Sequence, residues 1–247
     1  MRPLSSHEIV KVWEMAHDQP PQERALGLLS VACPDMTPDE LAGLNIAQRD
    51  ALFLELREET FGHNLSGFAE CPHCRERLEF KMTTTDIRGR PNSEPVEKEH
   101  SFELPEEDLS LRFRLPTSLD LSLVAGCGNV QEARGLLVKR CVSQVRRQGA
   151  PVPVEELPGE VIHRLAERMA ECAPQSEVLL DLHCPRCHHH WQTLFDIAAF
   201  LWTEVTTQAK RLLREVHALA SAYGWREGDI LSMSHVRRQF YLEMVTS

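Results

Sequence analysis

Most of the chain has the hydrophobic spacing of amphipathic helices. Apolar residues recur every three or four positions and are separated by polar residues. The segments with this spacing are residues 6–17, 22–32, 37–44, 45–62, 117–126, 129–149, 159–172, 198–224 and 225–245. Most begin at a capping residue or end at a glycine or before a proline, which are common helix boundaries. The pattern therefore predicts a mainly helical protein.

Three segments have apolar and polar residues in alternation instead. Residues 65–82 and 177–197 each hold a Cys-Pro-x-Cys sequence between two alternating runs, which predicts a strand, a tight turn and a second strand. Residues 101–116 contain a further alternating run without cysteines, read as one strand. The chain is thus expected to contain two similar hairpins that lie far apart in sequence.

The eight cysteines fall into two groups. Four occur singly among apolar helical residues, where a small side chain suits a packed core. These are Cys33, Cys127, Cys141 and Cys172. The other four form two CxxC pairs, Cys71 with Cys74 and Cys184 with Cys187. One CxxC turn supplies half of the four ligands that a structural zinc ion needs, so the two turns together predict one structural Zn²⁺ bound by all four cysteines.

This site completes the predicted fold class, which is α+β and mainly α. We expect a helical protein with a four-cysteine zinc ribbon formed by two β-hairpin knuckles distant in sequence, a knuckle being a CxxC turn with its two strands. Polar, turn-rich residues at 83–100 indicate a loop or linker. The expected regions are an N-terminal helical region (1–64), a first knuckle hairpin (65–88), a linker, strand and helical insertion (89–176), a second knuckle hairpin (177–197) and C-terminal helices (198–247).

Other interpretations of the cysteine pairs fit less well. Redox CxxC motifs open a helix after a strand, whereas both pairs here lie between strands. Disulfides are rare in a reducing compartment. A cytidine-deaminase zinc site needs an upstream His-x-Glu motif, which the sequence lacks. Replacement of one cysteine ligand by a nearby histidine stays open. The histidines near the turns are His73, His183, His188, His189 and His190.

The composition narrows the class of protein. Four thiolates leave no open position on zinc, and no nucleophile or phosphate-binding motif is present, so we expect no enzymatic activity. The net charge of −10 disfavours nucleic acid as the main partner, because phosphate binding needs clustered Lys and Arg. No apolar run is long enough for a membrane span, and the first residues do not read as a signal peptide. We expect a cytoplasmic protein with no membrane contact.

The C-terminal segment combines aromatic residues with an amphipathic helix. Tyr223 and Trp225 flank a glycine, and Ile230 and Tyr241 are among the apolar residues that follow. Such a segment packs on the protein's own body or docks on a partner. Both interpretations stay open, and these four residues are the candidate partner contacts.

Four blocks in order resemble the baseplate hub assembly chaperone family of contractile-tailed phages and phage-tail-like contractile injection systems. They are QRDALFLELREETFG, SGFAECPHCRERLEF, DLHCPRCHHHWQTLFDIAAFLW and AYGWREGDILSMSHVRRQFYLEMV. The resemblance implies a non-enzymatic factor for baseplate assembly, whose partners are baseplate or hub subunits in the producing bacterium or phage-infected host. The chain departs from the usual knuckle at Arg75 and His188, where glycine is common. The alternative function is a zinc-ribbon regulator that binds nucleic acid or transcription machinery.

Overall fold

The computed structural model describes residues 1–88, 99–173 and 178–246. About 57% of the residues are helical and 20% lie in strands, which confirms a mixed α+β, mainly α fold. The chain forms two compact units. Unit 1 comprises Met1–Pro38, Leu52–Asn64 and Asp196–Ser247, and unit 2 comprises Asp39–Ala51 and Leu65–Phe195.

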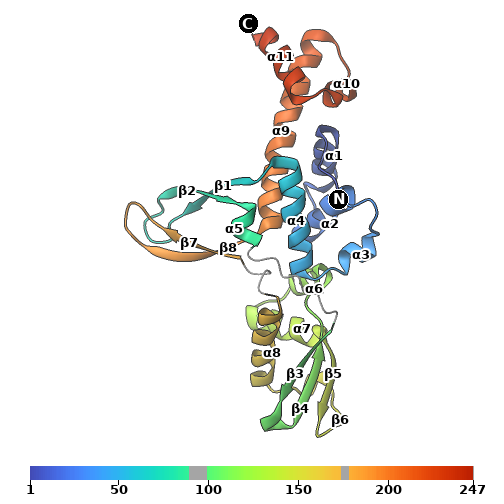
Figure 1. The fold of residues 1–247 in the computed structure, drawn as a ribbon, viewed down its shortest axis with the longest axis vertical. Coiled ribbons are helices and arrows are strands. Elements are labelled where there is room, and N and C mark those ends of the chain that lie inside the picture. The colour runs from blue at the N-terminus through green and yellow to red at the C-terminus, as the bar shows by residue number, and fades with distance from the viewer. Residues whose placement is uncertain (89–98, 174–177, 247) are drawn as a thin grey trace. The chain divides into compact units, whose positions relative to one another are not determined.

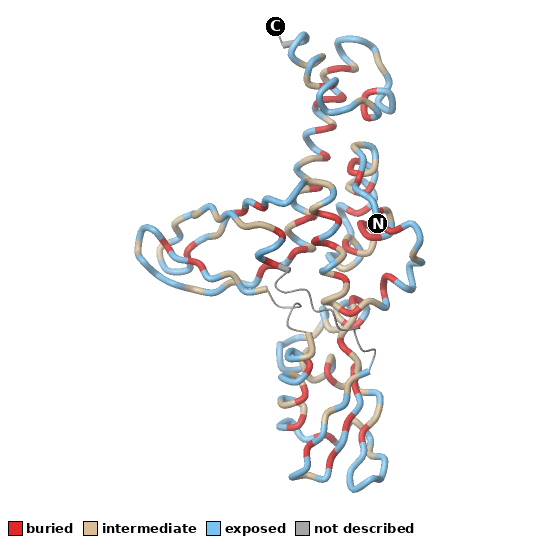
Figure 2. Tube along the Cα trace, viewed as in Figure 1, coloured by how far each residue is buried: buried red, intermediate tan, exposed pale blue. Residues whose placement is uncertain are grey.

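Unit 1 is built around one long helix, α9 (Ile197–Tyr223), against which helices α1, α2, α10 and α11 pack (Figure 1). The bounds are α1 (Ser6–Ala16), α2 (Pro21–Ala32), α10 (Glu227–Ser232) and α11 (His235–Thr246). The buried apolar residues of α9 recur every three or four positions along the helix (Figure 2). They are Ile197, Leu201, Val205, Ala209, Leu212, Val216 and Leu219. This single apolar face explains why the other helices assemble on α9.

Local capping sets the helix ends. Ser5, one residue before the helical segment predicted for residues 6–17, closes a capping box with Glu8 at the start of α1. Asn45 and Gln48 exchange hydrogen bonds at the start of α4 (Ile46–Phe61), as their spacing predicts. At the end of α9, Gly224 has φ of 69°, a left-handed conformation that glycine adopts without strain.

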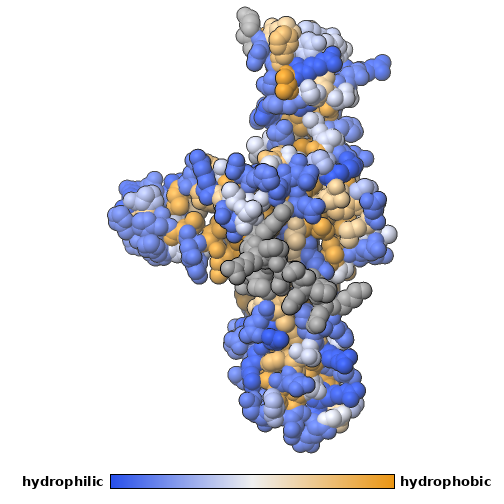
Figure 3. Space-filling model, in the orientation of Figure 1, coloured by the Kyte–Doolittle hydropathy of each residue, from blue (hydrophilic) through white to orange (hydrophobic). Residues whose placement is uncertain are grey.

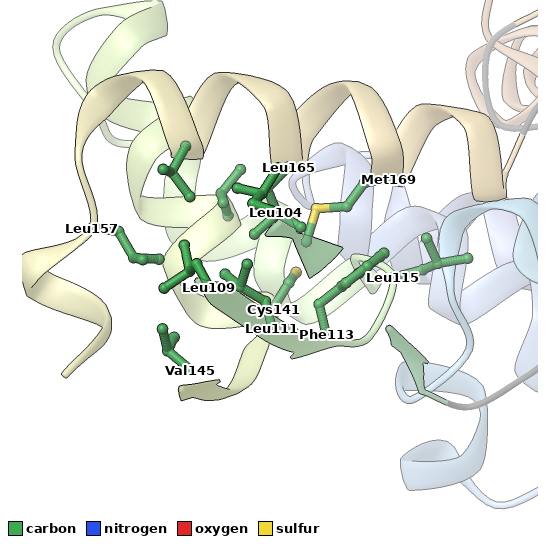
Figure 4. Close-up of a cluster of buried hydrophobic side chains, with 12 residues drawn as sticks. Leu104, Leu109, Leu111, Phe113, Leu115, Cys141, Val145, Leu157, Leu165 and Met169 are labelled. Atoms are coloured by element: carbon green, nitrogen blue, oxygen red, sulfur yellow. The ribbon is translucent and has the colours of Figure 1, made fainter. Parts of the chain in front are cut away.

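Unit 2 contains a four-stranded antiparallel sheet in the order β3–β4–β5–β6. The strands are β3 (His100–Leu104), β4 (Leu109–Phe113), β5 (Val142–Arg147) and β6 (Ala150–Pro151). The helices and 3-10 turns of unit 2 include α3 (Pro38–Ala42), α5 (Thr84–Arg88), η1 (Pro105–Glu107), α6 (Ser118–Val124), α7 (Val130–Cys141), η2 (Val154–Glu156) and α8 (Gly159–Cys172). In Figure 4, Leu165 and Met169 of α8 point toward the sheet, where Leu104, Leu111 and Phe113 are buried.

The helix predicted for residues 129–149 is wrong in its second half. The helix ends at Cys141, and the chain continues as β5, in which Val145 pairs with Leu111 of β4. Gln148 and Gly149 then have φ of 52° and 79°, which is the backbone of a tight hairpin turn. Gly149 therefore lies in the turn between β5 and β6 and does not end a helix, because pairing with β4 outweighs the local helical pattern.

The single strand predicted within residues 101–116 is wrong as well, because this segment forms the two strands β3 and β4. A turn at η1 separates them, and Asp108 at its end has φ of 48°. Part of the predicted linker, residues 89–98, lies outside the described residues.

A buried carboxylate organises the start of α6. The Asp120 side chain is 1% exposed and accepts hydrogen bonds from Arg114 at 2.5 and 2.9 Å, from Arg140 at 3.1 Å and from the Thr117 amide at 2.9 Å. Burial raises the pKa of Asp120, but the hydrogen bonds from Arg114 and Thr117 outweigh it and hold the pKa well below the ordinary value.

No helix among the described residues is both long and apolar enough to cross a bilayer.

Candidate metal centre and partner surface

Both predicted hairpins are present, and they lie side by side in unit 2 (Figure 1). The first consists of β1 (Asn64–Glu70) and β2 (Arg77–Thr83), and the second of β7 (Val178–His183) and β8 (His190–Phe195). Gly67 of β1 lies under the ring of Phe80, where an added Cβ would come within 2.3 Å of that ring. A larger residue at this position would therefore have to displace the Phe80 ring.

The two CxxC turns bring their four sulfur atoms together. The Sγ atoms of Cys71 and Cys187 are 3.6 Å apart, and those of Cys74 and Cys184 are 3.5 Å apart. All four Sγ atoms lie within 4.8 Å of one another. These separations exclude disulfides, which need about 2.05 Å. The four cysteines are thus placed so that they can hold one metal ion.

The two turns have the same backbone geometry. In the first, the Cys71 amide donates to the Glu76 carbonyl at 2.9 Å, and the Arg75 amide donates to the Cys71 carbonyl at 2.9 Å. In the second, Cys184 and His189 make the equivalent bond at 2.9 Å, and the His188 amide donates to the Cys184 carbonyl at 3.0 Å. The first cysteine of each pair is buried and the second is half-buried. The two knuckles are therefore structural duplicates.

Backbone amides also point at the sulfur atoms. Burial raises the pKa of Cys184, but the amides of Cys187 and Arg186 donate to its sulfur and bring the pKa down to about 7. At Cys187 the amide of His189 donates to the sulfur and lowers the pKa. Burial and the neighbouring sulfurs outweigh it and raise the pKa to about 12. Four thiolates this close repel one another, so a bound cation would be needed to hold all of them ionised near neutral pH.

The nearby histidines contact each other at the described turns. The rings of His183 and His190 are stacked at 4.3 Å between centroids, and those of His73 and His189 at 5.7 Å. Within the described ranges, the ligand atoms of His, Cys, Asp and Glu that cluster closely enough for a metal ion are the four cysteine sulfurs. This arrangement favours cysteine over histidine as ligand.

The four single cysteines, which were expected to pack in the core, differ in how deeply they are buried. Cys33 and Cys141 are buried, and Cys172 packs against the core beneath α8. Cys127 is half-buried. Burial raises the pKa of the Cys141 thiol to about 11, which makes it unreactive.

The C-terminal candidates separate into a surface cluster and a core residue. The rings of Tyr223 and Trp225 stack at 4.5 Å, and Tyr241 meets Trp225 edge-on at 4.8 Å. Tyr223 is 38% exposed, whereas Ile230 is fully buried in unit 1. The aromatic cluster, meaning Tyr223, Trp225 and Tyr241, thus lies at the surface, with Tyr223 exposed and the other two half-buried, whereas Ile230 belongs to the core.

A buried ion pair that sequence reasoning missed fixes this segment in place. Arg238 is 2% exposed; its Nε donates to Glu215 at 3.0 Å and its Nη2 to Ser6 at 3.2 Å. It thereby links α11 to α9 and α1. The signal in the sequence is Glu215, a charged residue three positions after Leu212 on the apolar face of α9.

Comparison with known families decides the wider identity. The family model described as T4 bacteriophage base plate protein matches residues 9–202. The chain belongs to this family. The part matched to the base plate family includes both knuckles, whereas α10 and α11 lie beyond it. This membership confirms the phage baseplate part of the resemblance, and the hub assembly chaperone family is a finer assignment. No curated protein and no solved structure matches the chain.

Proposed function

We propose that this protein is a non-enzymatic assembly factor, or chaperone, or a minor component for the baseplate hub of a phage tail or a phage-tail-like contractile injection system. Its membership in the base plate family is the observation that carries the proposal. The same membership gives no support to a zinc-ribbon regulator of transcription. The proposed partners are baseplate or hub subunits, met in the cytoplasm of the producing bacterium or phage-infected host.

The four-cysteine cluster is proposed to bind one structural Zn²⁺. With Zn–S bonds of about 2.3 Å, a tetrahedral site places sulfur atoms about 3.8 Å apart. The 3.5 and 3.6 Å separations here are close to that value. Four thiolates complete the coordination shell and leave no position for a substrate, which supports a structural and non-enzymatic role. The ion would hold together two hairpins that are far apart in sequence.

The aromatic cluster is the proposed partner contact. Tyr, Trp and Arg are the residue types that most often dominate binding energy at interfaces. Arg237 lies over the Tyr241 ring at 5.7 Å, so a cation borders the cluster. The stack is held by the protein's own packing, which lowers the entropy lost on binding.

Affinity purification tests the function directly. An N-terminally tagged chain is expressed in cells that produce the complete tail-like particle, and co-purifying proteins are identified by mass spectrometry. We expect baseplate or hub subunits. If baseplate subunits are recovered and the chain is absent from finished particles, the protein is an assembly factor. If the chain is retained in finished particles, it is a minor component. Consistent failure to recover any baseplate subunit, with tight salt-sensitive binding to DNA or RNA instead, contradicts the proposal.

A further inference from the structure

Helix α11 exposes a row of apolar side chains on successive turns. Val236, Phe240 and Met244 are 78%, 61% and 49% exposed and follow one another at intervals of four residues. Hydrophobic atoms reach the surface over this helix (Figure 3). The opposite side of α11 carries the buried Arg238, which holds the helix on α9. These three residues, called the α11 stripe, therefore face away from the unit that supports them.

The C-terminal segment that carries the α11 stripe is basic although the whole chain is acidic. Residues 205–247 carry six Lys or Arg against four Asp or Glu, whereas residues 1–204 carry 21 against 33. Glu215 and Arg238 form a buried ion pair with each other, which leaves five basic against three acidic residues in this segment. Arg226 and Arg237 are exposed, and Arg237 lies over Tyr241 beside the stripe. A partner with negative charge is thus favoured electrostatically.

We propose that the α11 stripe binds an acidic amphipathic helix of another baseplate subunit; this inference rests on the proposed function. Residues at intervals of four form a ridge that fits between the ridges of a second helix. The stripe is about 12 Å long, which corresponds to two to three turns of a partner helix. The adjoining Phe240 and Tyr241 rings, 6.2 Å apart, connect it to the aromatic cluster.

The charge beside the stripe argues against a second copy of this chain as the occupant, because a symmetric pair would bring the exposed Arg237 side chains of both copies to one interface. A stable interface with any partner needs about 800 Å² on each side, so the partner helix also covers residues beside the stripe. The stripe itself, with Tyr241, offers roughly 400 Å² of accessible surface. Its chemistry also argues against nucleic acid, because exposed Val, Phe and Met side chains match neither phosphates nor sugar hydroxyls.

Site-specific photo-crosslinking tests the occupant. The photoreactive residue p-benzoylphenylalanine replaces Phe240 in the tagged full chain, expressed with the complete particle. Phe68 on β1 is the matched control position, because it is also a phenylalanine and is 62% exposed. We expect a crosslink from position 240, and none from position 68, to a baseplate subunit at an acidic segment with apolar residues at helical spacing. A crosslink to a second copy of this chain, to nucleic acid, or equally from both positions overturns the inference.

Substitutions separate this inference from the proposed function. Phe240→Ser is expected to lower recovery of the partner subunit about tenfold, and Phe68→Ser to leave it unchanged. Arg237→Glu should lower recovery and reduce its sensitivity to salt. Unchanged helix content and metal content show that each variant is folded. If wild type and Phe240→Ser recover baseplate subunits equally, the function stands and the inference fails; if wild type recovers none, both fail.

Discussion

Arg75 and His188 occupy equivalent positions in the two knuckles and share a left-handed backbone, with φ of 58° and 57°. Each donates its amide to the carbonyl of the first cysteine in its pair. The knuckle therefore requires this conformation although neither residue is glycine. A side chain at a left-handed position costs about 1–2 kcal/mol of strain.

Glycine at either position should stabilise the fold. Relief of strain outweighs the extra chain entropy of glycine, about 0.4–1 kcal/mol, so Arg75→Gly and His188→Gly should each gain up to about 1 kcal/mol. Urea unfolding at constant Zn²⁺ measures this gain. His73→Gly, in the same turn without a positive φ, is the control and should be destabilising. Equal losses at positions 73 and 75 would show that Arg75 is not strained.

Removal of one thiolate should abolish tight metal binding. Cys71 is fully buried among the four sulfurs, so Cys71→Ser removes a ligand that no neighbour replaces. We expect one zinc ion per chain in the wild type, loss of the ion in Cys71→Ser, and a stability loss of several kcal/mol, on the order of that for other structural zinc sites. Elemental analysis and thermal unfolding with and without chelator measure both effects. Cys127→Ser should bind zinc normally, and a wild type without bound metal would contradict the site.

Asp120 should make unit 2 sensitive to acid. Its pKa is lowered in the folded state, so its stabilising contribution is complete above the ordinary Asp pKa of about 3.9 and is lost as the pH falls through the folded value. Asp120→Asn should therefore cost about 2 kcal/mol near pH 7, and its difference from wild type should shrink in acid. Urea unfolding over a pH series measures this. Asp181→Asn, on the exposed face of β7, is the control, and a pH-independent difference for Asp120→Asn would refute the assignment.

Two arginines on the same carboxylate should differ in their importance. Arg238 and Arg211 both donate to Glu215, but their side chains are 2% and 48% exposed. Arg238→Ala leaves a buried charge poorly paired and should cost about 3 kcal/mol, whereas Arg211→Ala should cost less than about 1 kcal/mol. Hydrogen exchange should show α11 opening in the first variant alone. Similar losses in both variants would mean that burial does not decide the strength of this pair.

Some features could be predicted from the sequence because they depend on residues close together in the chain. The Asn45–Gln48 capping box, the stop at Gly224 and the two CxxC turns each follow from a few neighbouring side chains. The presence of two CxxC turns also indicated that the two hairpins meet, because one turn supplies only two of the four ligands that a structural zinc ion needs. The mainly helical fold class followed from the spacing of apolar residues over long segments.

Other features depended on contacts between distant segments. Residues 142–147 pattern as helix but pair with β4 as a strand, since sheet pairing supplies hydrogen bonds and burial that a local pattern does not reveal. Arg238 is a charged residue that is buried, because Glu215 meets it from another helix. The exposure of Phe240 and the burial of Ile230 likewise followed from how α10 and α11 pack on α9. Local chemistry thus determined most of the elements and the four candidate metal ligands, and long-range packing alone decided which side chains are buried and which are exposed.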